Sequence, residues 1–314
     1  MFNPNFDMRD NFFVKIYKLM SRDKNIVILS NDMGAPKLDI IKKKFPNRFF
    51  NMGITEQNII SVAAGLASTG KKVIVYSIST FISLRALEQI KLDICVMNLP
   101  VIILTVGAGY SYAVDGPTHH AIDDVSVINS LGNTKIFCPS EPNQLLDMVS
   151  YIFSQKGLKY VRLDRGKWPR IKDISKKNLN EGFRVLGTSN DVCLISTGTM
   201  VHRALEVKKD LNKIKIDSTV IDIFRLKPIN QKVLGNKLSK FKLICIIEEH
   251  TINGGLSSIL MTQTVNYLKR NTKINICSIR DEDVYTYGKR DKIHNDLGLD
   301  KKSILNRIKR ILKK

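Results

Sequence analysis

Short β-branched runs alternate with helical segments along this chain, and this alternation constrains the fold more than any other feature. Residues 25–31, 71–79 and 100–109 are largely apolar on both faces, and helical spacing occupies the intervals between them. Such strands are typical of parallel sheets, because parallel neighbours need a crossover helix and are covered on both sides. A second series of the same kind begins at Phe183. The sequence therefore predicts an α/β protein with two doubly wound domains.

A polar stretch separates the two series. Residues 169–184 begin with Pro169 and show no sustained periodicity, which is typical of an interdomain linker. We expect a parallel-sheet domain over residues 1–168 and a smaller α/β domain over residues 185–314. Residues 301–314 alternate basic and apolar side chains at helical spacing, which predicts a terminal amphipathic helix docked on its own domain.

The chain is strongly basic, with 50 Lys and Arg residues against 29 Asp and Glu residues and a net charge of +21. The lysines are scattered, and no basic stripe with interleaved aromatic residues marks a nucleic-acid surface. The charge favours phosphorylated metabolites or an acidic partner subunit instead. Five widely spaced cysteines indicate reduced thiols, and the chain has neither a signal-peptide pattern nor a membrane-spanning apolar run. We therefore expect a cytoplasmic protein that binds neither nucleic acid nor membrane.

One stretch, residues 49–66 (FFNMGITEQNIISVAAGL), organises the first domain. Thr55 is a candidate N-cap, and Glu56 falls in the first helical turn, where exposed amides and the helix dipole favour a carboxylate. The following residues are apolar nearly all round, which predicts a buried helix. A capping role alone would account for Glu56. However, a carboxylate at the mouth of a buried helix needs a partner.

Further polar residues follow the predicted strands of the first domain. Asp32 ends one strand, residues 79–81 end the next, and a loop at 107–120 supplies Asp115 and His119. Ligands of open α/β sheets collect beyond the carboxyl ends of the strands, so these residues are expected to converge with the glutamate at one edge. Adjacent histidines in an irregular loop match no usual zinc spacing, and no metal site is predicted. His119 is instead a candidate proton donor or substrate ligand.

Three motifs, in this order, resemble the pyrimidine-binding domain of transketolase. They are GITEQN with Glu56, STF with Phe81, and DGPTHH with Asp115 and His119. The later segments STGTMV, VIDIFRLKPI and EEHTINGGLSS resemble the transketolase C-terminal domain. The resemblance extends over essentially the whole chain, which corresponds to about the C-terminal half of a full-length transketolase.

The resemblance implies thiamine diphosphate as the cofactor. Glu56 would hydrogen-bond the ring nitrogen of the aminopyrimidine, favour its imino tautomer and so promote loss of the proton from the thiazolium carbon. Phe81 would stack on the aminopyrimidine face, and Asp32 would lie with them at the cofactor. The ring nitrogen would also be the partner that the buried carboxylate needs.

The same resemblance assigns substrate contacts. His119 would act in catalysis beside the carbonyl and terminal hydroxyl of a donor ketose, and Asp115 would bind a neighbouring hydroxyl. Arg9 and Arg165 align with positions that bind the phosphate of an acceptor sugar, for which a guanidinium fork is suited.

Some positions depart from the family pattern. Gly107 stands where many transketolases carry a phosphate-binding histidine, and Ala108 lacks the arginine of deoxyxylulose-phosphate synthases. Leu84 replaces a second aromatic residue near the pyrimidine. The acceptor therefore need not be an ordinary pentose phosphate. Residues that could compensate for these losses are Lys37, Tyr110 and Tyr112.

No segment resembles the GDG…N motif that holds Mg²⁺ and the diphosphate in this superfamily. On its own, the chain would hold only the aminopyrimidine end of the cofactor. The resemblance thus implies a split enzyme, in which Mg²⁺ and the diphosphate are held by a separate N-terminal subunit and the active site lies at the interface. A large interface and a dimer of heterodimers are expected.

The expected activity is transfer of a two-carbon ketol unit between sugars or sugar phosphates. Two alternatives use the same cofactor: a deoxyxylulose-phosphate synthase-like reaction with pyruvate, and the β subunit of a 2-oxoacid dehydrogenase. The DGPTHH loop favours transketolase over the latter. A non-catalytic scaffold fits the intact motifs less well. Residues 248–250 (EEH) in the second domain are expected to be structural, because no site converges there.

Overall fold

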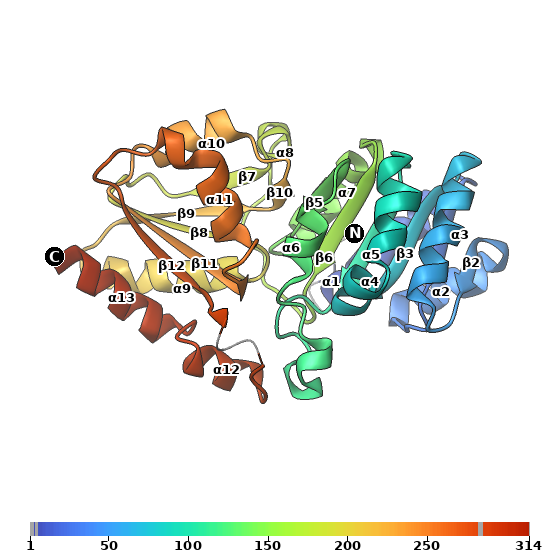
Figure 1. Cartoon of the computed structure of the whole chain (residues 1–314), viewed down its shortest axis with the longest axis horizontal. Coiled ribbons are helices and arrows are strands. Elements are labelled where there is room, and N and C mark those ends of the chain that lie inside the picture. Colours follow the sequence, from blue (N-terminus) through green and yellow to red (C-terminus); the bar gives the residue numbers. More distant parts are fainter. Residues whose placement is uncertain (1–2, 4–5, 282–284, 314) are drawn as a thin grey trace. The chain divides into compact units, whose positions relative to one another are not determined.

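The computed structural model describes residue 3, residues 6–281 and residues 285–313, and so leaves out the last residue of the predicted terminal helix. It divides into two compact units, each built around its own sheet (Figure 1). The first unit runs to Ala108 and resumes over Asp124–Asp173, and the second comprises Gly109–Asp123 and Ile174–Lys314. The predicted α/β class, with mostly parallel sheets, is confirmed.

The first unit has six strands hydrogen-bonded in the order β5-β6-β4-β3-β1-β2, and every neighbouring pair is parallel. Three of them, β1, β4 and β6, are buried at every position, as expected for strands covered on both faces. The strands are β1 (Ile26–Ser30), β2 (Phe49–Asn51), β3 (Lys72–Ile78), β4 (Ile102–Val106), β5 (Thr134–Phe137) and β6 (Leu158–Leu163).

The helices of this unit pack in two groups, as in a doubly wound sheet. Helix α1 packs against α2 and α7, whereas α3 packs against α4 and a π-helix at Ile90–Val96. A 3₁₀ turn lies at Pro46–Arg48, and α5 is a single short helical turn at Leu87–Gln89. The α-helices are α1 (Met8–Met20), α2 (Pro36–Lys44), α3 (Glu56–Ser68), α4 (Ser79–Arg85), α5 (Leu87–Gln89), α6 (Asp124–Asn129) and α7 (Pro142–Ser154).

Two helical predictions for this unit are wrong in detail. The helical segment expected between residues 79 and 100 is broken, because the buried Ala86 leaves helical geometry at φ −109° and ψ 19° and the chain continues as α5 and the π-helix. Helix α3 is buried on one face only, since Gln57, Asn58 and Ser61 lie at the surface.

The second unit has five strands in the order β12-β11-β8-β9-β7. Only the edge pair β7–β9 is antiparallel, and the other pairs are parallel. The strands are β7 (Phe183–Leu186), β8 (Val192–Ser196), β9 (Ser218–Ile223), β11 (Leu243–Thr251) and β12 (Lys273–Ile279), with a short β10 at Arg225–Lys227. The helices are α8 (Lys176–Glu181), α9 (Met200–Lys213), α10 (Gln231–Leu238), α11 (Leu256–Thr264), α12 (Arg290–Asp296) and α13 (Lys301–Lys313), with 3₁₀ turns at Ala113–Asp115, Pro117–His119 and Val265–Tyr267.

The polar stretch predicted as a linker contains a short helix, α8. Ser175 and Asn178 form a capping box at its start, and Gly182 ends it at φ +85° with an αL conformation. The capping box satisfies backbone amides that such a short helix would otherwise leave open, which explains how a segment without apolar periodicity is ordered.

The C-terminal helix α13 docks on its own unit, as predicted. Ile304 and Ile308 are fully buried, and the helix packs against α9 and β12. All five cysteines are buried free thiols. Of the helices within the described residues, none has both the length and the apolar character needed to span a bilayer.

Candidate active site

Glu56 is the first residue of α3, and its side chain is buried with 6% exposure. The preceding Thr55 does not cap the helix through its side chain, because its hydroxyl donates to the Met52 carbonyl at 2.8 Å. Glu56 lies in the first turn of the helix, where the helix dipole favours a negative charge.

The partner of this carboxylate is Arg85, at the end of α4. Its Nη1 donates to Glu56 Oε1 at 2.9 Å, and its Cζ lies 4.2 Å from the centroid of the Phe81 ring. Phe81 and Arg85 share one helix face because they are four residues apart. Two predicted cofactor residues, Glu56 and Phe81, are thus brought together around a flat cation.

Arg85 was not among the predicted site residues. A signal was present in the sequence, since a cation four positions after the STF motif must lie on the same face of the helix as Phe81. About half of its side chain is exposed, so it can move when another group takes its place. A buried acceptor beside an aromatic face can hold a flat ring that donates hydrogen bonds.

Asp32 is exposed and contacts the segment that precedes α3. It follows β1 in a left-handed conformation at φ +46°, and its carboxylate accepts a hydrogen bond from Asn51 Nδ2 at 2.9 Å. Asn51 Oδ1 in turn accepts from the backbone amides of Asp32 and Gly53, each at 3.0 Å. Asp32 therefore shapes the turn that leads from β2 into α3.

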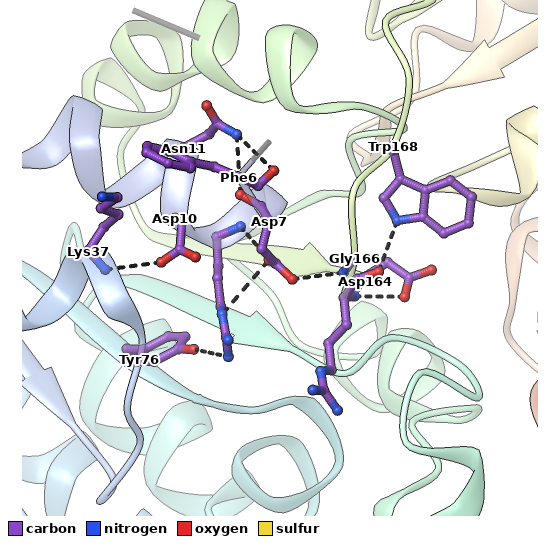
Figure 2. A network of polar contacts seen from close by, with 11 residues as sticks. Phe6, Asp7, Asp10, Asn11, Lys37, Tyr76, Asp164, Gly166 and Trp168 are labelled. Carbon is purple, nitrogen blue, oxygen red and sulfur yellow. Dashed lines mark hydrogen bonds and ion pairs between the residues drawn. The ribbon is translucent and has the colours of Figure 1, made fainter. Parts of the chain in front are cut away.

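The segments of Arg9 and Arg165 are joined through Asp7. Figure 2 shows Asp7 beside Gly166, whose amide donates to Asp7 Oδ2 at 2.8 Å. Arg9 Nη1 lies 3.4 Å from the Tyr76 hydroxyl, and its backbone amide donates to Asp7 Oδ1 at 3.0 Å. Burial alone would lower the pKa of Arg9, but Tyr76 and the neighbouring carboxylates raise it above its usual value. This guanidinium stays charged at every physiological pH.

Lys37, one of the residues that could compensate for these losses, already contacts this network. Its ammonium lies 4.2 Å from the centroid of the Phe6 ring, and its backbone amide donates to Asp10 Oδ1 at 3.1 Å (Figure 2). These contacts place a third cation on the same part of the unit as Arg9.

The loop with the DGPTHH motif belongs to the second unit. Two 3₁₀ turns, Ala113–Asp115 and Pro117–His119, meet at Gly116, whose φ of +81° is the left-handed region that glycine adopts without strain. Asp115 is exposed and His119 is partly exposed. His119 Nδ1 lies 3.0 Å from the Thr118 hydroxyl, and the His119 ring lies 6.0 Å from that of Tyr112.

The next residue, His120, has the opposite role. It is buried, its Nε2 donates to the Ala113 carbonyl at 3.2 Å, and its ring packs edge-on against Tyr110 at 4.8 Å. Burial lowers its pKa, which keeps the ring neutral. His120 and Tyr110 therefore pack against each other inside the loop and help to hold its shape.

A cluster of charged residues lies against this loop and was not predicted from the sequence. Glu249 is buried on β11, and its carboxylate accepts two hydrogen bonds from Arg290 at 2.9 and 2.6 Å and contacts His294 Nε2. Burial alone would raise the pKa of Glu249, but Arg290 and His294 hold it well below its usual range. A Cβ on Gly109 would collide with this carboxylate, so the loop begins directly on the cluster.

Its neighbour Glu248 is structural, as expected for the EEH segment. Both oxygens of its carboxylate accept backbone amides at the start of α11, from Leu256 at 2.5 Å and Ser257 at 3.1 Å. The expectation that nothing converges on this segment holds for Glu248 but overlooks the cations on Glu249. Within the ranges that the structure describes, no three His, Cys, Asp or Glu side chains gather as metal ligands would.

Comparisons with known proteins agree on one family. Residues 5–170 match the family model of the transketolase pyrimidine-binding domain, and residues 182–304 match that of the transketolase C-terminal domain. The chain is 29% identical to a subunit of the apulose-4-phosphate transketolase of Actinobacillus succinogenes, over 93% of this chain and 95% of that protein. It is 31% identical to a putative transketolase C-terminal section of Methanocaldococcus jannaschii, over 98% of this chain and 96% of that protein.

Some relatives are about twice as long. The chain is 30% identical to 1-deoxy-D-xylulose-5-phosphate synthase of Clostridium tetani and covers only 47% of it. A solved structure described as a split gene transketolase, inactive beta4 tetramer, superimposes with a TM-score of 0.87 at 28% identity, over 98% of this chain and 99% of that one. These full-length matches agree with the order of the two domains and with the motifs around Glu56, Phe81 and Asp115. The chain therefore belongs to the transketolase family.

Proposed function

We propose that this chain is the C-terminal subunit of a transketolase-type enzyme. It would transfer a two-carbon ketol unit between sugars or sugar phosphates, through thiamine diphosphate held at an interface with an N-terminal subunit. The observation that carries this proposal is the buried Glu56 carboxylate, bonded to a flat cation that stacks on Phe81.

The residues around Glu56 fit an aminopyrimidine. Arg85 is a flat, hydrogen-bond-donating group that touches the Phe81 face and the Glu56 carboxylate together, and an aminopyrimidine makes the same two kinds of contact. Glu56 would hold a proton at the ring nitrogen, and the half-exposed Arg85 would turn toward solvent. When bound, thiamine diphosphate supplies the nucleophilic carbon that attacks a ketose carbonyl.

The substrate contacts come from polar groups that already have fixed positions. His119 would donate a hydrogen bond beside the donor carbonyl, and Asp115 would accept one from a sugar hydroxyl. Arg9 and Arg165 would bind an acceptor phosphate, because Asp7 holds their two segments together and a guanidinium pair matches phosphate oxygens. Asp32 would act indirectly, through the turn that precedes Glu56.

A partner subunit would complete the cofactor site. The names of the relatives support this, since one is a transketolase subunit, another is a C-terminal section, and the solved beta4 tetramer is described as inactive. The N-terminal subunit would hold Mg²⁺ and the diphosphate, in a dimer of heterodimers. The five buried free thiols suit a reducing cytoplasm.

Reconstitution tests this proposal. The purified chain alone should show negligible ketol transfer, and activity should appear when it is mixed with an N-terminal subunit that carries the GDG…N motif from the same genome. A coupled assay with a ketose phosphate donor and an aldose acceptor measures the transfer. Robust activity of the chain alone, or none from an assembled complex that binds thiamine diphosphate, would contradict the proposal.

A synthase reaction with pyruvate is the second candidate. It is favoured by the relatives named 1-deoxy-D-xylulose-5-phosphate synthase, which include matches with 30% and 33% identity. The same reconstituted complex separates the two: carbon dioxide release from pyruvate with an aldose phosphate would indicate the synthase, and ketol exchange between sugars would indicate transketolase.

His119→Ala should impair donor handling more than cofactor binding. We expect kcat/KM for the donor ketose to fall by about 10²-fold, because a positioned hydrogen-bond donor contributes on that scale, while the affinity for thiamine diphosphate stays unchanged. Val114→Ala is the matched control, since Val114 is an exposed side chain of the neighbouring 3₁₀ turn and has no hydrogen-bonding group. An unchanged donor profile in His119→Ala would remove this residue from the substrate site.

A further inference from the structure

A cavity of about 200 Å³ opens at the amino ends of β3, β4 and β6 in the first unit. Its walls are largely apolar and come from both helix groups, because α3 contributes Ala67 and α7 contributes Phe153. Ala67 stands eleven residues after Glu56 on the same helix, a separation of about 16 Å at 1.5 Å per residue. The cavity is therefore separate from the proposed cofactor site.

One buried cation, Lys159, lines this cavity. Its residue is 1% exposed on β6, and no carboxylate or hydrogen-bond acceptor contacts its ammonium among the described residues. An ammonium that is withdrawn from water without a partner is unfavourable, and proteins usually pair such a group. The cavity beside Lys159 is where a counter-charge can enter.

The other charged groups near Lys159 do not neutralise it. Lys72 pairs with Asp23 at 2.8 Å, and Lys71 lies 3.4 Å from an Asn25 side-chain oxygen. On the neighbouring strand β5, Lys135 stands in register with Lys159 and donates to the carbonyl of Lys156 at 2.6 Å. The surroundings of Lys159 are thus cationic, and the Asp23 carboxylate is already paired with Lys72.

The pKa of Lys159 is lowered to about 7, mainly by burial and to a smaller extent by repulsion from the Lys135 ammonium. Near neutral pH the side chain is therefore divided between ammonium and free amine. An anion bound beside it would favour the ammonium form, because an opposite charge at close range raises the pKa of a lysine. Binding and protonation of Lys159 are then linked.

We propose that this cavity binds a short aliphatic monocarboxylate, with its carboxylate paired to the ammonium of Lys159. The apolar walls fit a hydrocarbon chain, and the buried Lys159 ammonium, which has no carboxylate partner among the described residues, matches a carboxylate. The volume lies below the usual range of roughly 300–1,000 Å³ for drug-sized ligands, which limits the ligand to a small molecule. The residues that line the apolar part are Ala67, Val73, Pro100, Ile102 and Phe153.

Calorimetric titration of the full chain with sodium butyrate tests this site. Butyrate should bind saturably at pH 6, and butan-1-ol, which has the same chain length without the charge, should not. Between pH 6 and pH 9 the affinity should fall about a hundredfold, because butyrate stays ionised while a group with a pKa of about 7 loses its proton. Affinity that is unchanged up to pH 9 would assign binding to ordinary surface lysines and overturn the proposal.

Two variants assign the effect to one side chain. Lys159→Met keeps a chain of similar length without the charge and should weaken butyrate binding at pH 6 at least tenfold. Lys135→Met is the matched control, since Lys135 shares the sheet face but does not line the cavity, and its butyrate affinity at pH 6 should equal that of the wild type.

The site would be refuted if both variants lost the same butyrate affinity, or if butyrate did not bind the wild type saturably. Should Lys159→Met fail to fold, the wild-type pH profile and the comparison with butan-1-ol still decide the question. None of these measurements depends on ketol transfer, so the proposed function and this site can fail independently.

Discussion

Glu56→Gln should lower the turnover of the assembled enzyme by roughly 10²–10⁴-fold, the usual contribution of a positioned acid–base group. The amide keeps the size of the side chain and its place at the start of α3, but it can no longer carry the negative charge that stabilises a proton on the pyrimidine nitrogen. Folding should be little affected, because the amide oxygen can still accept a hydrogen bond from Arg85, whose side chain is half exposed.

Hydrogen–deuterium exchange at the thiazolium carbon is the measurement closest to this role. In the wild-type complex the exchange should be fast, and in Glu56→Gln it should slow by a factor similar to the loss of turnover. Glu88→Gln, an exposed glutamate on α5, is the charge-matched control and should change neither rate. A Glu56→Gln complex with normal exchange would exclude the proposed role of this carboxylate.

A second prediction concerns Arg85, whose replacement should not weaken cofactor binding. Because its guanidinium occupies the Glu56 carboxylate and the Phe81 face, it competes with any flat ring for the same contacts. Arg85→Gln should therefore bind the cofactor at least as tightly as the wild type, provided that Arg85 makes no contact of its own with the bound cofactor. A weaker affinity would instead show that Arg85 holds the cofactor in place.

The sequence was sufficient for the class of fold, because strands buried on both faces and the helical segments between them are local signals. It also located the helix start at Glu56 and the loop with Asp115 and His119. It was not sufficient where a partner comes from elsewhere in the chain. The broken helix after Arg85 depends on a buried Ala86, and the pairing of Glu249 with Arg290 joins residues 41 positions apart.

His119 and His120 also show what the sequence alone could not predict. His119 and His120 are equivalent in sequence, yet one is partly exposed and the other is buried against Tyr110. Only the fold of the loop decides which ring faces solvent, because the two 3₁₀ turns set the direction of each side chain. His119 is a candidate from its place in the loop, and the family motif gives it a substrate role, but neither signal shows that His120 is buried.

Arg290→Met should destabilise the chain by about 3–5 kcal/mol, because it leaves the buried Glu249 carboxylate without its main counter-charge. Urea unfolding at pH 7 measures the change in the free energy of unfolding. Lys292→Met on the same helix is the control: its ion pair with Asp296 is exposed, and its loss should cost less than about 1 kcal/mol. Adding Glu249→Gln to Arg290→Met should recover part of the loss, since no uncompensated carboxylate then remains.

The pH dependence of stability distinguishes this explanation from a simple packing defect. Because the folded pKa of Glu249 lies below its usual value of 4.5, its contribution to stability is present above about pH 4.5 and is lost as the pH falls below that value. The wild type should therefore lose stability in acid more steeply than Arg290→Met, and parallel curves would contradict the electrostatic account. Since the loop of Asp115 and His119 begins at Gly109, directly on the Glu249 carboxylate, Arg290→Met should also reduce kcat/KM for the donor sugar in the assembled enzyme.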